Sequence, residues 1–70
     1  MKYLVIYEKG KDGYGAYVPD LPGCVAVGES LDDVKALVRE AIAMHLQSMR
    51  QDGDPIPNPT TQSEYMEMVG

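Results

Sequence analysis

The sequence predicts a small α+β domain, in which one helix packs on an antiparallel sheet in the order β-β-β-α-β. Before residue 30, three short segments rich in β-branched and aromatic residues are separated by turns that contain glycine and proline. After residue 30, apolar residues recur at three- and four-residue spacing, which is typical of an amphipathic helix. A chain of 70 residues is long enough for one domain only, so residues 1–70 are assigned to a single domain.

The first 18 residues predict a β-hairpin. Residues 2–8 and 14–18 are rich in residues that favour strands. Between them, residues 10–13 contain two glycines and an aspartate, which adopt the backbone conformations of a tight turn without strain. The two strands are therefore expected to pair directly.

A loop rich in proline separates the hairpin from a third strand. Pro19 and Pro22 cannot donate the hydrogen bonds of a sheet, so residues 19–23 are expected to form a shaped loop. Residues 24–27 then predict a short strand that ends at Gly28.

The predicted helix begins after Ser30, which is a favourable N-cap, and Asp33 stands at the acidic position of a capping box. It is expected to end near Gln51, ahead of an Asp-Gly pair. Its apolar stripe consists of Leu31, Val34, Leu37, Val38, Ala41, Ile42, His45, Leu46 and Met49.

Two further segments follow the helix. Residues 54–59 contain three prolines and predict a stiff, extended connector. Residues 63–69 are compatible with a short strand or a helical turn, and we favour a strand because the segment is short and a sheet edge is available.

Both faces of the predicted sheet carry apolar side chains, although a single helix covers only one face. In the first strand, alternation places Tyr3, Val5 and Tyr7 on one face and Leu4 and Ile6 on the other. In the third strand, it places Cys24 and Ala26 on one face and Val25 and Val27 on the other. Two interpretations remain open. Either the second face carries scattered surface hydrophobes, or another chain covers it, which predicts a homo-oligomer such as a dimer or tetramer.

The charge balance excludes several classes of protein. Eleven acidic and six basic residues give a net charge of −5, and the basic residues are scattered, so a direct interaction with DNA is not expected. No apolar stretch is long enough to span a membrane, and no apolar signal region precedes the first strand. The single cysteine fits a reducing compartment, and a cytoplasmic location is predicted.

No motif supports catalysis, a cofactor or a metal site. The single histidine, His45, lies on the apolar stripe of the helix, and the single cysteine, Cys24, begins a strand. Both are interpreted as packing residues, with a Cys–His catalytic pair as a distant alternative, because a buried thiol has a raised pKa and is inert. One histidine and one cysteine cannot supply the four ligands of a structural zinc site.

Three motifs in this order and spacing resemble the HicB-like antitoxins of toxin–antitoxin systems. The chain opens with a hairpin that begins Tyr-Leu-Val-Ile-Tyr-Glu, continues into a Pro-Asp-Leu-Pro-Gly-Cys loop, and reaches the helix through Gly-Glu-Ser. The motif residues are Pro19, Asp20, Leu21, Pro22, Gly23, Cys24, Gly28 and Ser30. The Pro-rich connector also resembles that family, so the resemblance covers nearly the whole chain.

The resemblance implies a partial ribonuclease-H-like fold and the role of an antitoxin that binds and masks a small basic RNA-cleaving toxin of the HicA type. It does not imply nuclease activity, because the first strand lacks the carboxylates of a two-metal site. Typical members carry a second, DNA-binding domain, which would begin where this sequence ends. A stand-alone oligomeric binding or regulatory domain without a toxin is the alternative function.

Residues 51–70 contain four acidic residues and no basic one, which suggests a surface that attracts a positively charged toxin. The alternative is a solvated acidic segment that only keeps the protein in solution. The candidate interface residues are Glu64, Tyr65, Met66, Glu67 and Met68 in this segment, together with Val25 and Val27 in the third strand.

Overall fold

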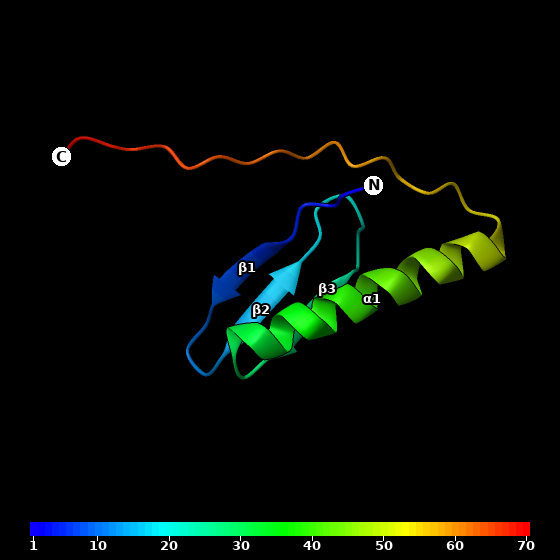
Figure 1. Cartoon of the computed structure of the whole chain (residues 1–70), viewed down its shortest axis with the longest axis horizontal. Coiled ribbons are helices and arrows are strands. Elements are labelled where there is room, and N and C mark those ends of the chain that lie inside the picture. Colours follow the sequence, from blue (N-terminus) through cyan, green and yellow to red (C-terminus); the bar gives the residue numbers. More distant parts are fainter.

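The chain folds as three strands followed by one long helix, in a computed structural model that describes all residues from 1 to 70 (Figure 1). The elements are β1 (Ile6–Lys9), β2 (Tyr14–Tyr17), β3 (Val25–Gly28) and α1 (Leu31–Asp52). The strands form one antiparallel sheet in the order β1-β2-β3. The predicted α+β class, with a sheet of three strands followed by one helix, is confirmed.

The register of the sheet sorts the side chains as the alternation predicts. Ala16 in the central strand pairs with Tyr7 on one side and Ala26 on the other, and this row faces the helix. The next row pairs Tyr17 with Ile6 and Val25 and lies on the opposite face. Both faces of the sheet therefore carry apolar side chains, as expected.

Hydrogen bonds between backbone groups of the loop itself stabilise the connection between β2 and β3. The Leu21 amide donates to the carbonyl of Val18 at 3.0 Å, and the Cys24 amide donates to the carbonyl of Leu21 at 3.0 Å. Gly23 completes the turn with a φ of 84°, a left-handed conformation that glycine adopts without strain. These contacts turn Leu21 into the core, where it is 1% exposed.

Both ends of α1 are capped by local sequence. The Ser30 hydroxyl accepts a hydrogen bond from the Asp33 amide at 3.1 Å, so the predicted N-cap is confirmed. At the other end, Gly53 adopts a φ of 73°, and its amide and that of Asp54 donate to carbonyls of the last turn. The helix ends one residue later than predicted, at Asp52.

The core lies between α1 and the two strands that it covers, β2 and β3. Its fully buried residues are Ala16, Val18, Leu21, Cys24, Val34 and Val38. The apolar stripe of the helix is thus only partly buried: Leu37, which the spacing places in the stripe, is 43% exposed. The helix leaves β1 largely uncovered because it crosses the other two strands.

The expected last strand is not formed within this single chain. Residues 63–69 are extended, but they make no ladder hydrogen bonds with any strand. They pass the outer edge of β1, where a shallow hollow separates Ser63, Glu64 and Tyr65 from residues 5–7. A strand requires backbone pairing as well as an extended conformation, and here the segment stands off from the edge.

No helix in the structure combines the length and the apolar character needed to cross a membrane.

Candidate interaction surface

Residues 54–70, the C-terminal segment, turn back from the end of α1 and run along the β1 side of the domain (Figure 1). The connector, residues 54–59, contains the three prolines and carries no regular secondary structure. Near its middle, the Tyr3 hydroxyl donates a hydrogen bond of 2.5 Å to the carbonyl of Pro57. The N-terminal end of the chain therefore holds the first part of the segment against the domain.

Asp20 anchors the segment a few residues further along. Its Oδ1 accepts hydrogen bonds from the hydroxyls of Thr60 at 3.2 Å and Thr61 at 2.7 Å. Its Oδ2 accepts from the amides of the same two residues, at 3.1 and 3.0 Å. These bonds, from Thr61 above all, favour the ionised carboxylate and lower the pKa of Asp20 below its ordinary value.

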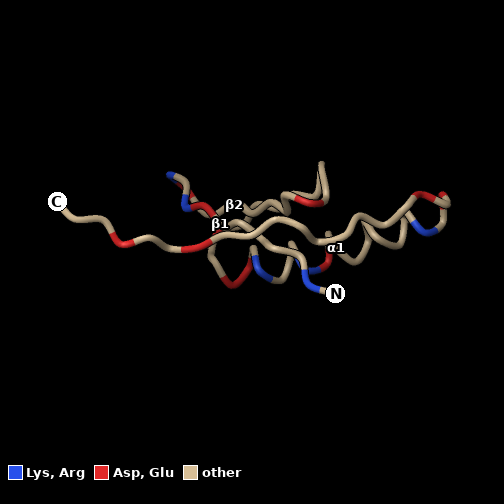
Figure 2. Tube along the Cα trace, turned by 90° about the horizontal axis from the view of Figure 1, so that it is seen from above, with Lys and Arg blue, Asp and Glu red and all other residues tan.

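Beyond this anchor, residues 62–70, here called the acidic tail, are exposed throughout. The tail carries two carboxylates, on Glu64 and Glu67, and no basic residue (Figure 2). Its large apolar side chains are also uncovered: Tyr65, Met66, Met68 and Val69. The tail therefore presents apolar side chains and carboxylates on the same exposed segment.

The other candidate interface residues lie elsewhere. Val25 and Val27 are 62% and 77% exposed on the face of β3 that points away from the helix. Because β3 and β1 are the two edges of the sheet, the valines lie at the edge opposite the acidic tail. The structure therefore does not bring the two predicted sets together, and it presents them as separate surfaces.

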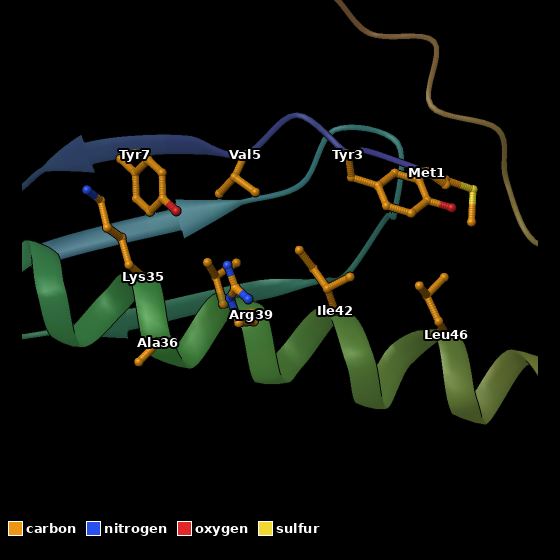
Figure 3. A pocket seen from close by; sticks show the side chains of 10 residues that line it. Met1, Tyr3, Val5, Tyr7, Lys35, Ala36, Arg39, Ile42 and Leu46 are labelled. Carbon is orange, nitrogen blue, oxygen red and sulfur yellow. The ribbon is translucent and has the colours of Figure 1, made fainter.

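A groove that was not predicted from the sequence lies between α1 and β1, including the residues that lead into β1 (Figure 3). Its volume is about 590 Å³, and eight of its ten lining residues are apolar. Tyr3, Val5 and Tyr7 point toward the helix from one wall, and Ile42 and Leu46 form part of the other. Alternation places the first three on one face of the strand, but no pattern in the sequence indicates that this face lines a groove beside the helix.

The groove has a positive charge on one side. Lys35 and Arg39 lie one turn apart on α1 and line it, and none of the ten lining residues is acidic. The groove can therefore receive apolar side chains together with carboxylates.

The structure places the two residues of the alternative Cys–His pair apart in the chain, with Cys24 immediately before β3 and His45 on α1. Cys24 is enclosed in the core, and burial raises the pKa of its thiol. The side-chain hydrogen bonds of the chain do not include Cys24 or His45. No group of three or more His, Cys, Asp or Glu side chains lies close enough together to hold a metal ion.

Known proteins are similar to this chain in sequence. A family model described as the HicB-like antitoxin of bacterial toxin–antitoxin systems matches residues 3–69. A 14.9 kDa protein from the rep-hol intergenic region of Haemophilus phage HP1 is 35% identical over 66 residues, which cover 94% of this chain and 50% of that protein. Antitoxin HicB 2 of Photorhabdus laumondii is 27% identical over 64 residues, which cover 91% of this chain and 46% of the antitoxin.

A solved structure of a HicA3 and HicB3 toxin–antitoxin complex contains a chain with the same fold. It matches with a TM-score of 0.72 and 30% identity, covering 86% of this chain and 70% of the other. Of the phage protein and of Antitoxin HicB 2, this chain spans about half the length. Because the family model covers nearly every residue of the sequence, the chain belongs to the HicB-like antitoxin family.

Proposed function

We propose that this chain is the part of an antitoxin that binds and masks a small basic RNA-cleaving toxin of the HicA type, and that it acts in the cytoplasm without enzymatic activity. Membership of the HicB-like family and the likeness to a chain from a HicA3–HicB3 complex support this role. The observation that carries it is the acidic tail, which is anchored at Thr60 and Thr61 and exposed beyond them.

The proposed mechanism is competitive masking. An RNA-cleaving toxin needs a positive surface to hold phosphates. Glu64 and Glu67 on the tail attract that surface and accelerate the encounter. Tyr65, Met66 and Met68 then supply the apolar contacts, because charge contributes more to the rate of association than to affinity. The tail would thus occupy the space that the RNA backbone takes on the toxin.

The anchor gives the tail a defined starting position. Four hydrogen bonds to one carboxylate hold the chain at Thr60 and Thr61, so only residues 62–70 extend beyond the anchor. Fixing a short segment on a partner costs less conformational entropy than fixing the whole C-terminal segment would. This arrangement favours an interaction segment over an unstructured extension.

The test is co-expression of the chain with the small basic protein encoded beside it, with growth rescue and the association rate of the purified pair as readouts. Glu64→Lys combined with Glu67→Lys is expected to lower the association rate by about tenfold or more. It is also expected to weaken protection at equal expression.

Asp12→Lys combined with Glu40→Lys is the matched control, because it changes the net charge equally at exposed positions outside residues 51–70. It should retain most of the protection. If the tail variant protects as well as the parent, the tail does not guide the toxin. The toxin interface then lies on the sheet or the helix, with Val25 and Val27 as the next residues to replace.

A further inference from the structure

We propose that the groove between β1 and α1 receives the acidic tail of a second copy of this chain, so that two chains exchange tails in a symmetric dimer. The groove is open because α1 packs over β2 and β3 and leaves the inner side of β1 bare. Within it, Ile42 and Leu46 of the helix face Tyr3 and Val5 across the gap (Figure 3). A small domain gains stability when such a surface is covered.

The chemistry of the tail matches that of the groove. The groove is lined by apolar side chains with Lys35 and Arg39 at one wall and without an acidic residue. The tail combines exposed apolar side chains with Glu64 and Glu67 and has no basic residue. Each surface therefore supplies the charge that the other lacks, and both supply apolar area to bury.

The extended conformation of the tail suits a narrow groove. In an extended chain, successive side chains point to opposite sides. One side of the tail then carries Glu64, Met66 and Met68, and the other carries Tyr65, Glu67 and Val69. Either side presents two apolar groups and one carboxylate, so the tail can place apolar groups in the groove while a carboxylate reaches the cations on its wall.

The occupant is a second copy because the tail is directed away from the groove of its own chain. The anchors at Pro57 and at Thr60 and Thr61 hold the segment beside the outer edge of β1, whereas the groove opens on the face of the sheet. From there the tail runs past the end of β1 and beyond the body of the domain (Figure 1). Two chains related by a twofold axis can each offer a tail and a groove.

A tail seated in a second copy is covered, so the dimer and a toxin would compete for it. The dimer itself, however, is tested on the purified chain alone, and its failure leaves the proposed antitoxin function untouched.

Sedimentation equilibrium of the full chain is the experiment. The parent chain, of 7.7 kDa, is expected to dimerise reversibly. Lys35→Glu with Arg39→Glu reverses the charge of the groove. Glu64→Lys with Glu67→Lys reverses the charge of the tail. Each pair is expected to raise the dissociation constant of the dimer by about tenfold or more, because attraction becomes repulsion at both symmetric contacts.

A charge swap separates the proposed contact from a general effect of charge. Mixing the groove-reversed chain with the tail-reversed chain should restore dimerisation, since the mixed dimer pairs each tail with a groove of opposite charge. A chain that carries all four substitutions should dimerise by itself. Lys11→Glu, in the hairpin turn outside the groove, is the control and should dimerise like the parent.

The variants are expected to fold, because Lys35 and Arg39 are exposed and the tail makes no contact with the core. Circular dichroism checks this before sedimentation. A parent chain that stays monomeric up to about 100 µM would overturn the proposal, since specific complexes associate more tightly. A dimer that neither reversal weakens would also overturn it, and would place the interface on the face with Val25 and Val27 instead.

Discussion

Asp20 and Thr61 lie 41 positions apart in the sequence and are joined by two hydrogen bonds. The Thr61 hydroxyl donates to Oδ1 of Asp20 at 2.7 Å, and the Thr61 amide donates to Oδ2 at 3.0 Å. The Pro-Asp-Leu-Pro-Gly-Cys loop thereby positions the last part of the chain. One side of this loop inserts Leu21 into the core, and its neighbour Asp20 holds the C-terminal segment outside it.

Replacing Asp20 with Asn is expected to release the C-terminal segment while the core remains folded. The amide group retains one acceptor oxygen but loses the charge and the second acceptor that the two threonines share. Hydrogen exchange at the Thr60 and Thr61 amides should accelerate, and exchange in α1 should not change. Asp12→Asn, in the hairpin turn, makes the same change of charge away from the segment. It should leave the exchange rates of the Thr60 and Thr61 amides and of α1 unchanged.

The anchor is also expected to depend on pH. Hydrogen bonds from Thr61 and Thr60 lower the pKa of Asp20 below its ordinary value of 3.8. The contribution of the anchor is therefore complete above that ordinary value and disappears as the pH falls through the lower pKa of the folded chain. In an NMR titration, the Thr60 and Thr61 amide signals should move with the Asp20 carboxyl, at a midpoint below 3.8. A midpoint at or above 3.8 would contradict the observed hydrogen bonds.

Leu21→Ala is expected to destabilise the domain severely. The side chain is 1% exposed, and removing buried methyl groups of a leucine lowers the free energy of unfolding by about 2–5 kcal/mol. That is a large part of the stability of a small domain. Leu37→Ala is the matched control, because that leucine is 43% exposed, and a change of about 1 kcal/mol or less is expected. Urea unfolding followed by circular dichroism measures both.

Gly13→Ala is expected to disturb the contact between the hairpin and the end of β3. A Cβ at this position would lie 2.5 Å from the carbonyl oxygen of Gly28, so the backbone must shift to admit it. A loss of about 1–3 kcal/mol in the free energy of unfolding is expected. Gly10→Ala in the same turn should be tolerated, since its Cβ would approach nothing closer than 3.6 Å. Equal thermal unfolding temperatures for the two variants would show that the contact does not matter.

Local signals account for what could be predicted from the sequence. Ser30 and Gly53 mark the ends of the helix through backbone rules that operate within a few residues. The alternation of side chains along the third strand assigned Cys24 and Ala26 to one face and Val25 to the other. The structure agrees, because Cys24 and Ala26 are at least half-buried and Val25 is exposed. The three-strand sheet and the helix follow from these signals alone.

Features that depend on distant parts of the chain were not predictable. An aspartate in a proline-rich loop gives no indication that it binds threonines 40 and 41 positions later. The groove depends on how far α1 lies from β1, which helical spacing does not specify. The expected last strand was inferred from the shortness of the segment and a free sheet edge, but neither shows whether an extended segment pairs with that edge.

The anchor between Asp20 and the two threonines has a consequence for how the sequence can change over generations. Four hydrogen bonds meet at one carboxylate, so losing the acid leaves both hydroxyls without their acceptor. Where a relative has replaced the aspartate, selection to retain the hydroxyls at positions 60 and 61 should relax. Substitutions at these positions are therefore expected to covary across the family, while the exposed tail beyond them diverges with whatever surface it meets.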